Sequence, residues 1–592
     1  MSEQVAASRE QGARTSCSLL AAACSLFIAL PVLAATKADR WVEKTLKSMS
    51  LDEKIGQMLM PGNTLGAFRN LDSEELTKMR GEVVDYHAGG YHVFGGDPAV
   101  VALIVNELQK SAKVPLLVAD NFEGGVGYVL FGATRLPLGM AMGATGDERI
   151  AYEAAKLTAE EGRALGVNVN FYPVADVQNN PQNPIINIRS FGEDPASVSR
   201  FVRAYIRGAE DHGQLATAKH FPGHGDVATD SHLAMPVLDV TRARLDAVEL
   251  PPFRAAVEEK VGAFMSAHIW LPQLEPTKDL PSTLSKNVMT DLLRGELHYQ
   301  GLVFTDAMSM RGVTNTFGNA EASVLAVEAG ADMLVLPPDV PAAFNAIKAA
   351  VAGGRITEAR LDESVRRILR AKASLNLQDA RNRFTDVNKI MTTVGSKPHR
   401  DFAQSISDRA ITLVRDANGV LPLKPSPDLR VVQINLLDSR TGWREGVPGR
   451  IMSAELPKRF PRAVTVQVDD QSTATELDMV RKLAQLADAV VVNGYIRVAA
   501  YKGSIDLKES QTALLKDLIA LKKPLVYTSF GSPYVLTHIA DLPSYVVAYD
   551  TSQTAELAAV RAMTGEIEYR GKLPISLPGL YPIGHGLRAA SP

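Results

Sequence analysis

The chain has 592 residues, a formal net charge of −3 at pH 7 and a hydrophobic fraction of 46%. A single hydrophobic core stops growing at about 250 to 300 residues, so this length predicts two domains. The small negative charge provides no basic field that would attract a polyanion, which argues against nucleic-acid binding.

The N-terminal residues predict export. A nearly unbroken apolar run over Ser18–Ala35 follows two arginines and ends in small residues that suit signal peptidase. We therefore expect residues 1–34 to be a signal peptide and the protein to be periplasmic or extracellular. The run is long enough to remain as a membrane anchor, and a lipoprotein signal at Cys24 is a lesser alternative. Because the two cysteines, Cys17 and Cys24, both lie here, the mature chain would contain no disulfide.

Residues 40–375 show short apolar runs that alternate with helix-length segments. Ser50 and Glu53 supply a capping box for a helix that leads into the first run. The strand candidates are 57–60, 90–94, 116–119, 167–171, 215–218, 262–266, 302–305 and 333–336, and the helices expected between them include 147–165, 195–212, 242–259 and 287–298. This alternation predicts an α/β fold, a parallel (β/α)₈ barrel, for the first domain.

Polar side chains follow five of the expected strands. These residues are Asp120 and Asn121 after the third strand, Asp176 after the fourth, Lys219 and His220 after the fifth, His268 after the sixth and Asp306 after the seventh. The chemistry of such barrels takes place at the carboxyl ends of the strands. We therefore expect these side chains to meet at one rim.

The loop over residues 219–232 is the part of this rim that is richest in ionisable groups. It begins with Lys-His-Phe-Pro-Gly-His-Gly-Asp and ends with Asp230-Ser231-His232. An Asp two residues before a His can orient the imidazole and raise its basicity, which suits proton transfer near neutral pH. A metal site is one alternative, although the spacing matches no zinc signature and Lys is a poor ligand. A hydrogen-bonded polar loop without a chemical role is the other. We expect catalysis without a metal or another cofactor.

A second domain is expected after the barrel. The pattern breaks into a polar linker over 376–404, and a smaller α/β domain is expected over 405–592. Its β-like runs are 430–435, 489–492, 524–528 and 545–548, and a helix is expected over 474–487. No residue of this domain shows a catalytic pattern.

The barrel region resembles the glycoside hydrolase family 3 β-N-acetylglucosaminidases. Besides the loop, three motifs occur in family order, namely Asn-Phe-Tyr-Pro-Val-Ala-Asp-Val at 170–177, Arg-Ser-Phe-Gly-Glu-Asp-Pro at 189–195 and Gly-Leu-Val-Phe-Thr-Asp-Ala-Met-Ser-Met at 301–310. The resemblance covers about residues 51–373 and implies an α/β sandwich as the second domain. It also implies a retaining exo-glycosidase that releases terminal β-N-acetylglucosamine by double displacement, with peptidoglycan fragments as the expected substrate.

The resemblance assigns the catalytic roles. Asp306 would be the nucleophile, although its place after a strand also suits a helix N-cap. His232 would be the general acid/base with Asp230 as its orienting partner, and the alternative for His232 is a surface loop histidine. A neutral imidazole repels an incoming anion less than a carboxylate would, which leaves room for phosphate as the acceptor.

The resemblance also assigns Arg189, Lys219 and His220 to sugar binding. The alternatives are that Arg189 pairs with Glu193 or Asp194, and that Lys219 lies buried against Asp176. A carbohydrate substrate is then the expected partner, and no stable protein partner is inferred.

One position departs from the family pattern. The family places an Asp after the third strand to bind a sugar hydroxyl, where this chain has Asn121. Asn accepts a hydrogen bond but carries no charge, so either the sugar is bound differently or Asp120 substitutes. Val126 also replaces an arginine that is often found after the two glycines. Rival functions are a β-glucosidase or β-xylosidase, a glycoside phosphorylase, and a sugar-binding protein without activity.

Overall fold

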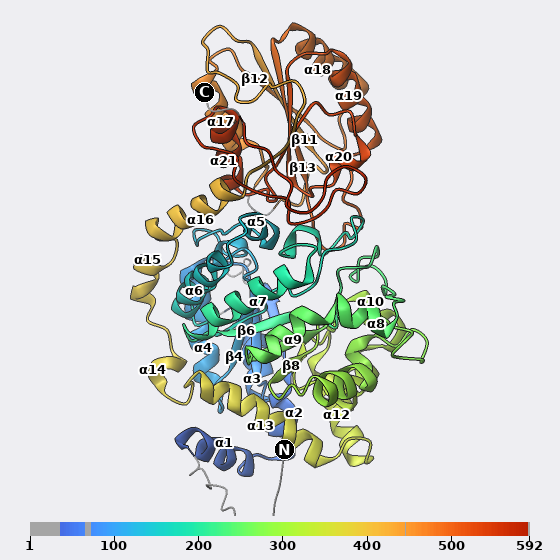
Figure 1. Ribbon diagram of the computed structural model, residues 1–592. Helices are drawn as coiled ribbons and strands as arrows, with labels where there is room; N and C mark the ends of the chain where they lie inside the picture. Colours follow the sequence, from blue (N-terminus) through green and yellow to red (C-terminus); the bar gives the residue numbers. More distant parts are fainter. Residues whose placement is uncertain (1–35, 65–72, 444–445, 590–592) are drawn as a thin grey trace, which may run out of the picture.

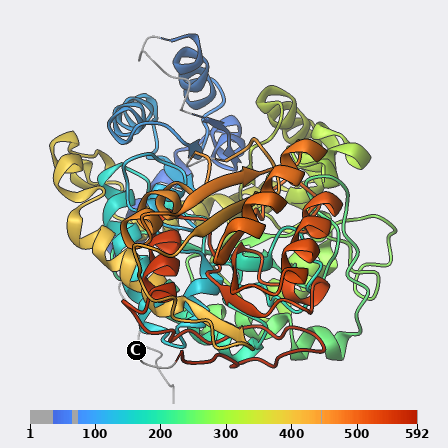
Figure 2. The ribbon, with the colours of Figure 1, turned by 90° about the horizontal axis from the view of Figure 1, so that it is seen from above.

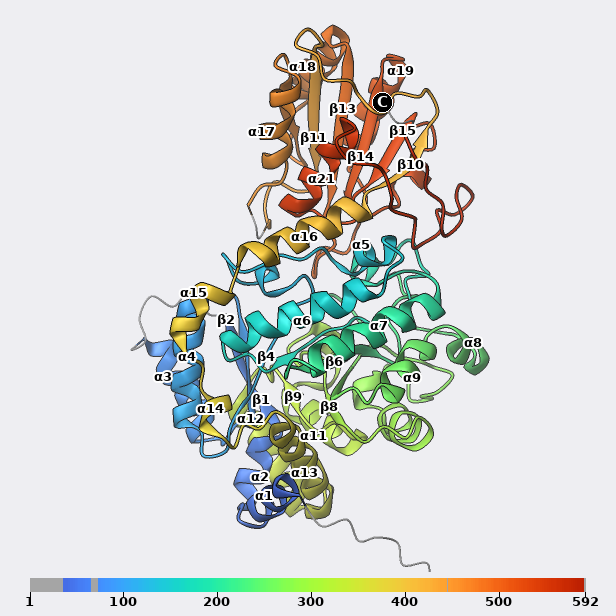
Figure 3. The same cartoon turned by 60° about the vertical axis from the view of Figure 1, so that its left-hand side comes forward.

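The computed structural model describes residues 36–64, 73–443 and 446–589, which form two α/β domains (Figure 1). The second domain lies against one end of the first, and helix α1 (Lys37–Lys47) lies at the opposite end (Figure 3). The predicted signal peptide, residues 1–34, is outside the described residues. Within the described part of the chain, no helix is long and apolar enough to cross a bilayer.

The first domain is a barrel of parallel strands. Its strands pair in chain order as β2 (Gly62–Thr64), β3 (Gly90–Phe94), β4 (Leu117–Asp120), β5 (Val169–Asn170), β6 (Leu215–Phe221), β7 (Ala263–Ser266) and β8 (Leu302–Phe304). The short strand β1 (Leu59–Met60) precedes β2 directly and pairs with β9 (Leu334–Val335). A bridge between Phe304 and Met333 joins β8 to the start of β9. The ring therefore closes, which confirms the predicted TIM-like barrel, with β1 and β2 together as its first strand.

Helices precede, connect and follow the barrel strands, and most of them lie around the outside of the barrel (Figure 1). They are α2 (Leu51–Gln57), α3 (Glu74–Val84), α4 (Pro98–Ser111), α5 (Gly139–Ala144), α6 (Arg149–Ala164), α7 (Pro195–Glu210), α8 (Arg242–Ala247), α9 (Leu250–Glu258), the π-helix η5 (Asn287–Glu296), α10 (Arg311–Phe317), α11 (Asn319–Ala329), α12 (Val340–Ala352) and α13 (Glu358–Ser374).

Local sequence explains where two of these helices begin. Ser50 and Glu53 form the predicted capping box of α2, since each side chain accepts the backbone N–H of the other residue, at 3.2 and 2.9 Å. The predicted helix over 242–259 is instead two helices, α8 and α9. Pro251 and Pro252 have no N–H to continue α8, and proline fits the first turn of α9.

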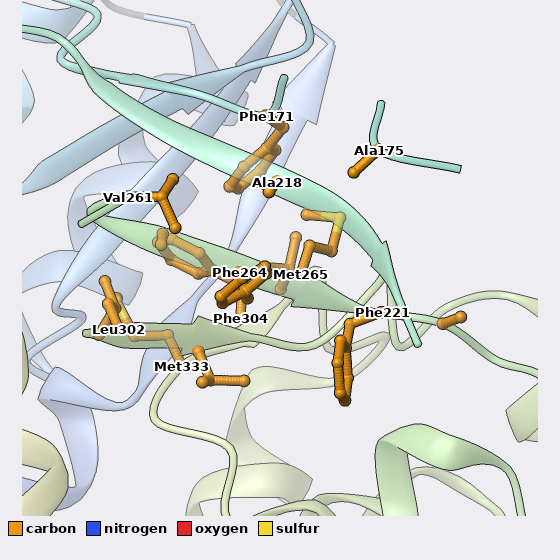
Figure 4. Packing of buried hydrophobic residues seen from close by; sticks show 14 of the residues in the cluster. Phe171, Ala175, Ala218, Phe221, Val261, Phe264, Met265, Leu302, Phe304 and Met333 are labelled. Carbon is orange, nitrogen blue, oxygen red and sulfur yellow. The ribbon is translucent and has the colours of Figure 1, made fainter. Parts of the chain in front are cut away.

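Large apolar side chains fill the barrel beneath its polar rim (Figure 4). The rings of Phe171 and Phe304, next to the ends of β5 and β8, lie edge to face with centroids 5.2 Å apart. On the other face of the sheet, Phe264 of β7 packs in the same way on Tyr299, at 4.5 Å, because its neighbour Met265 faces the cavity. Burying an aromatic side chain contributes roughly 1.5 to 3 kcal/mol. This packing holds the strand ends, and hence the polar residues that follow them, in fixed positions.

The second domain is a six-stranded sheet with helices on both faces (Figure 2). The parallel strands are β11 (Val431–Leu437), β12 (Val464–Val468), β13 (Ala489–Ile496), β14 (Leu525–Gly531) and β15 (Ser544–Val547), and β10 (Thr412–Asp416) pairs antiparallel to β15. Helices α17 (Arg450–Arg459) and α21 (Gln553–Met563) pack on one face, and α18 (Ala474–Leu486) and α19 (Glu509–Ala520) on the other. Four of these strands and α18 were predicted. The edge strands β10 and β12 were not.

Helix α16 (Lys397–Ala410) connects the two domains (Figure 3). The segment predicted as a linker, 376–404, contains the short helices α14 (Ala380–Arg383) and α15 (Ile390–Thr393) and the beginning of α16. The predicted boundary between residues 404 and 405 therefore falls inside a helix. The domains also meet away from α16, where Arg135 pairs with Asp550 at 2.9 Å.

Candidate active site

A cavity of about 640 Å³ lies at the carboxyl ends of the barrel strands, where the second domain meets the barrel. Its size is that of a site for a small ligand. Of the residues predicted for the site, Asn121, Arg189, Lys219, His220, His232 and Asp306 line this cavity. Asp120, Asp176 and His268, which were also expected at this rim, are buried and do not line the cavity, so the expected rim is present in part.

Asp306 follows β8 directly and lines the cavity. Its Oδ1 accepts the N–H of Ala307 at 2.7 Å. Burial alone would raise the pKa of this carboxyl, but the nearby imidazoles of His220, His268 and His232 lower it to about 2. Asp306 does not cap a helix, because α10 begins only at Arg311. An ionised carboxylate at neutral pH is what a nucleophile in glycoside hydrolysis requires.

His232 and Asp230 form a hydrogen-bonded dyad at the cavity wall. Asp230 Oδ1 accepts from both His232 Nδ1 and the His232 backbone N–H, each at 2.9 Å. Burial would raise the pKa of Asp230, but its hydrogen bonds with His232 lower it overall. The Asp230 side chain is fully buried, whereas 23% of the His232 side chain is exposed. Since Nδ1 is used by Asp230, proton transfer falls to Nε2. His232 is therefore part of the cavity rather than a free surface histidine.

Arg189 and Lys219 are both held by Glu123. Arg189 donates from Nε and Nη2 to the two carboxylate oxygens, each at 2.8 Å, and Lys219 Nζ lies 2.7 Å from Oε1. Burial would raise the pKa of Glu123, but the two cations hold it well below its usual range. The carboxylate balances both charges and directs the two side chains along the cavity wall.

The alternative partners considered for the two cations are wrong. Glu193 accepts from Ser576 Oγ at 2.8 Å, and Asp194 caps α7. Asp176 binds His220 rather than Lys219, with 2.7 Å between Asp176 Oδ2 and His220 Nδ1. That contact leaves the Nε2 atom of His220 for the cavity.

Asn121 and Asp120 take different positions at the end of β4. Asn121 lines the cavity, accepts from Lys219 Nζ at 3.2 Å and has its Nδ2 atom 3.2 Å from His92 Nε2. Asp120 is completely buried and is not part of the cavity wall. Successive residues of a strand point to opposite faces, so only one of the two can face the barrel interior. The expectation that Asp120 substitutes for the missing carboxylate is therefore wrong.

Several cavity residues were missed from the sequence. Glu123, two residues after Asn121, received no role from the sequence, and Trp443, Arg497 and Tyr501 come from the second domain. The last three lie in loops after β11 and β13. Ligands of open α/β sheets bind outside the carboxyl ends of the strands, so the position of these loops was the available signal. Among the described residues, no group of three or more His, Cys, Asp or Glu side chains is arranged to hold a metal.

Residues 50–371 match the glycosyl hydrolase family 3 N-terminal domain, and residues 411–581 match the C-terminal domain of that family. The chain belongs to glycosyl hydrolase family 3. A beta-N-acetylglucosaminidase/beta-glucosidase of Cellulomonas fimi is 30% identical over 554 residues, which are 90% of this chain and 95% of the relative. A beta-hexosaminidase A of Pseudoalteromonas piscicida is 33% identical over 57% of this chain and 61% of its own.

Two solved structures are similar to nearly the whole chain. The beta-N-acetylglucosaminidase of Paenibacillus sp. str. FPU-7 is 34% identical, with a TM-score of 0.78 over 90% of this chain and 99% of that chain. The beta-glucoside phosphorylase BglX is 28% identical, with a TM-score of 0.82 over 93% of this chain and 98% of that chain. The protein is thus a family 3 glycoside hydrolase with the two-domain architecture of these structures.

In this family 3 enzyme, we expect Glu123→Gln to lower kcat/KM by about 10²-fold, mainly through a higher KM. The substitution leaves Arg189 and Lys219 buried without their balancing charge, and breaking such a buried pair costs about 3 to 5 kcal/mol. Steady-state kinetics and thermal unfolding measure the two effects separately.

Asp332→Asn is the matched control for this substitution. Asp332 is also a buried carboxylate between two cations, Arg294 at 2.7 Å and Arg367 at 3.1 Å, but it does not line the cavity. Both variants should lose thermal stability, and only Glu123→Gln should change KM strongly. An unchanged KM in Glu123→Gln would show that Glu123 does not contribute to substrate binding.

Proposed function

We propose that this family 3 enzyme is a retaining exo-glycosidase that hydrolyses terminal β-N-acetylglucosamine residues, with peptidoglycan fragments as substrates. The observation that carries the proposal is the pairing of an ionised Asp306 with the Asp230–His232 dyad in one cavity. One group serves as nucleophile and the other as acid and base, as double displacement requires. The relatives named for N-acetylglucosaminides and hexosaminides support the choice of sugar.

The proposal assigns one residue to each role in both steps of the reaction. In the first step, Asp306 attacks the anomeric carbon, the bond to the leaving oxygen breaks, and that oxygen takes the proton from His232 Nε2. In the second step, a water molecule gives a proton to His232 and attacks the same carbon, which releases the sugar and restores the Asp306 carboxylate. Asp230 stays ionised throughout and stabilises the imidazolium form of His232.

Phosphorolysis is a second candidate, because two observations favour an anion as acceptor. The acid/base group is an imidazole, which is neutral after it has given up its proton and does not repel an anion. Arg497 lines the cavity, and its guanidinium donates to the Thr441 carbonyl and forms no ion pair with a carboxylate among the described residues. The similar structure of BglX is that of a phosphorylase. In phosphorolysis, phosphate replaces water as the attacking group in the second step.

A panel of aryl β-glycosides, measured with and without phosphate, tests the proposal. We expect the N-acetylglucosaminide to have a higher kcat/KM than the glucoside and the xyloside, with free sugar as the product. A preference for glucoside or xyloside would overturn the choice of sugar, and a sugar 1-phosphate product would establish phosphorolysis.

Asn121→Asp should lower KM about fivefold without changing the preference, since a charged hydrogen bond adds about 1 kcal/mol.

A further inference from the structure

One buried carboxylate ties both ends of the loop Arg497–Lys502, which follows β13. Asp438, the first residue after β11, accepts the N–H of Arg497 through Oδ2 at 2.7 Å and forms an ion pair with Lys502 through the same oxygen. Lys502 Nζ also donates to the carbonyl of Arg497 at 2.9 Å. The Asp438 side chain is 1% exposed and that of Lys502 is 13% exposed, so water screens this pair little.

The same loop reaches the acid/base dyad of the barrel. The Tyr501 N–H donates to Asp230 Oδ2 at 2.8 Å. The Tyr501 ring lies against the His232 ring, with centroids 5.0 Å apart and an interplanar angle of 63°. The two oxygens of Asp230 therefore bind different domains. Oδ1 binds His232 in the barrel, and Oδ2 binds the loop of the second domain. The orientation of the carboxylate that directs His232 depends on where this loop is held.

The backbone of the loop does not adopt this position freely. Tyr501 has a φ of +64°, in the left-handed region, which costs a non-glycine residue about 1 to 3 kcal/mol. Burial of the side chain does not offset that cost, since Tyr501 is 57% exposed. Such a conformation persists only where neighbouring contacts impose it. The hydrogen bonds and the ion pair that Asp438 and Lys502 form with the ends of the loop are contacts that can impose this conformation.

We propose that the Asp438–Lys502 ion pair is a positioning element of the acid/base dyad, acting through the Tyr501 amide. The inference rests on the proposed roles of His232 and Asp230. The pair holds the loop so that Asp230 Oδ2 is occupied from the second domain, which leaves Oδ1 aligned with His232 Nδ1. Neither Asp438 nor Lys502 lines the cavity, so both act through Tyr501 and not on the substrate.

The first test compares leaving groups in the full-length enzyme. Lys502→Met should lower kcat/KM about 10-fold for a disaccharide or an alkyl glycoside, which need protonation of the leaving oxygen. The change should stay within about twofold for an activated nitrophenyl glycoside. Lys502→Arg keeps the charge and should recover most of the loss.

Two further variants keep the test informative if Lys502→Met folds poorly. Asp438→Asn removes the ion pair but keeps an acceptor for the Arg497 N–H, and it should show the same dependence on the leaving group. Arg561→Met is the matched control, because Arg561 pairs with Asp408 at 2.6 Å in the second domain and does not line the cavity. That variant should have the wild-type profile for both leaving groups.

A double-mutant cycle separates positioning from a general loss of structure. Lys502→Met should have no further effect in a His232→Ala background, because the group it positions is gone. If Lys502→Met lowered kcat/KM equally for both leaving groups, or if its effect were fully additive with that of His232→Ala, the positioning role alone would be overturned. If His232→Ala itself showed no dependence on the leaving group, the acid role of His232 and the inference that rests on it would both be overturned.

Discussion

Asp306→Ala is expected to lower kcat by about 10⁴-fold or more while the protein stays folded, because the variant cannot form the glycosyl-enzyme bond. Mass spectrometry of the wild type after reaction with a 2-fluoro sugar should locate the label on Asp306. Added azide should restore part of the turnover of the variant and produce the inverted glycosyl azide. A label on another residue would show that the nucleophile is not Asp306.

The pH profile provides a control for the same assignment. The pKa of Asp306 is about 2, below the ordinary value of an aspartate. The carboxyl therefore stays ionised until the pH falls to that range. A fall in activity between pH 6 and 4 would therefore reflect a group other than the nucleophile. Asp306→Asn keeps the size of the side chain and an oxygen for the Ala307 N–H, so it should be as inactive as the alanine variant.

His232→Ala is expected to lower kcat/KM by about 10² to 10⁴-fold for substrates with poor leaving groups. For activated aryl glycosides, kcat/KM of His232→Ala should fall far less, because their leaving oxygen departs in the first step without a proton. Kinetics across a series of leaving groups measure this difference as a steeper dependence on leaving-group pKa.

The control for His232 is a histidine of the same domain outside the cavity. His212, whose Nδ1 lies 2.9 Å from the Gly208 carbonyl at the end of α7, can be replaced by alanine without touching the site. His212→Ala should leave the leaving-group series unchanged. Equal losses for all leaving groups in His232→Ala would mean that His232 shapes the loop and does not transfer a proton.

The second domain takes part in the active site of this enzyme. Trp443, Arg497 and Tyr501 complete the cavity wall, and Tyr501 contacts both members of the dyad. No residue of this domain shows a catalytic pattern in the sequence, and none of the carboxylates that the structure describes in it lies in the cavity wall. We propose that it encloses the cavity and holds the barrel loop that carries His232, the proposed acid/base group.

Much of the fold could be predicted because its signals are local. The barrel strands are continuous apolar runs, the capping box of α2 lies within four residues, and Asp306 stands at the end of a buried strand. The edge strand β12 escaped prediction for an equally local reason. β12 has exposed residues along most of its length, so its sequence lacks the apolar run that marks a buried strand.

The sequence by itself determined the barrel, the family and the residues of the catalytic loop, because the loop motif is contiguous and parallel strands bring their carboxyl ends to one rim. Only the tertiary structure decided which of these residues pair. Glu123, which follows β4, binds Arg189 of the helical turn 187–189 and Lys219 of β6, and Tyr501 binds Asp230 across 271 residues of chain. The physical reason is that a buried charge takes the opposite charge nearest in space, and that neighbour depends on how strands are ordered and domains docked.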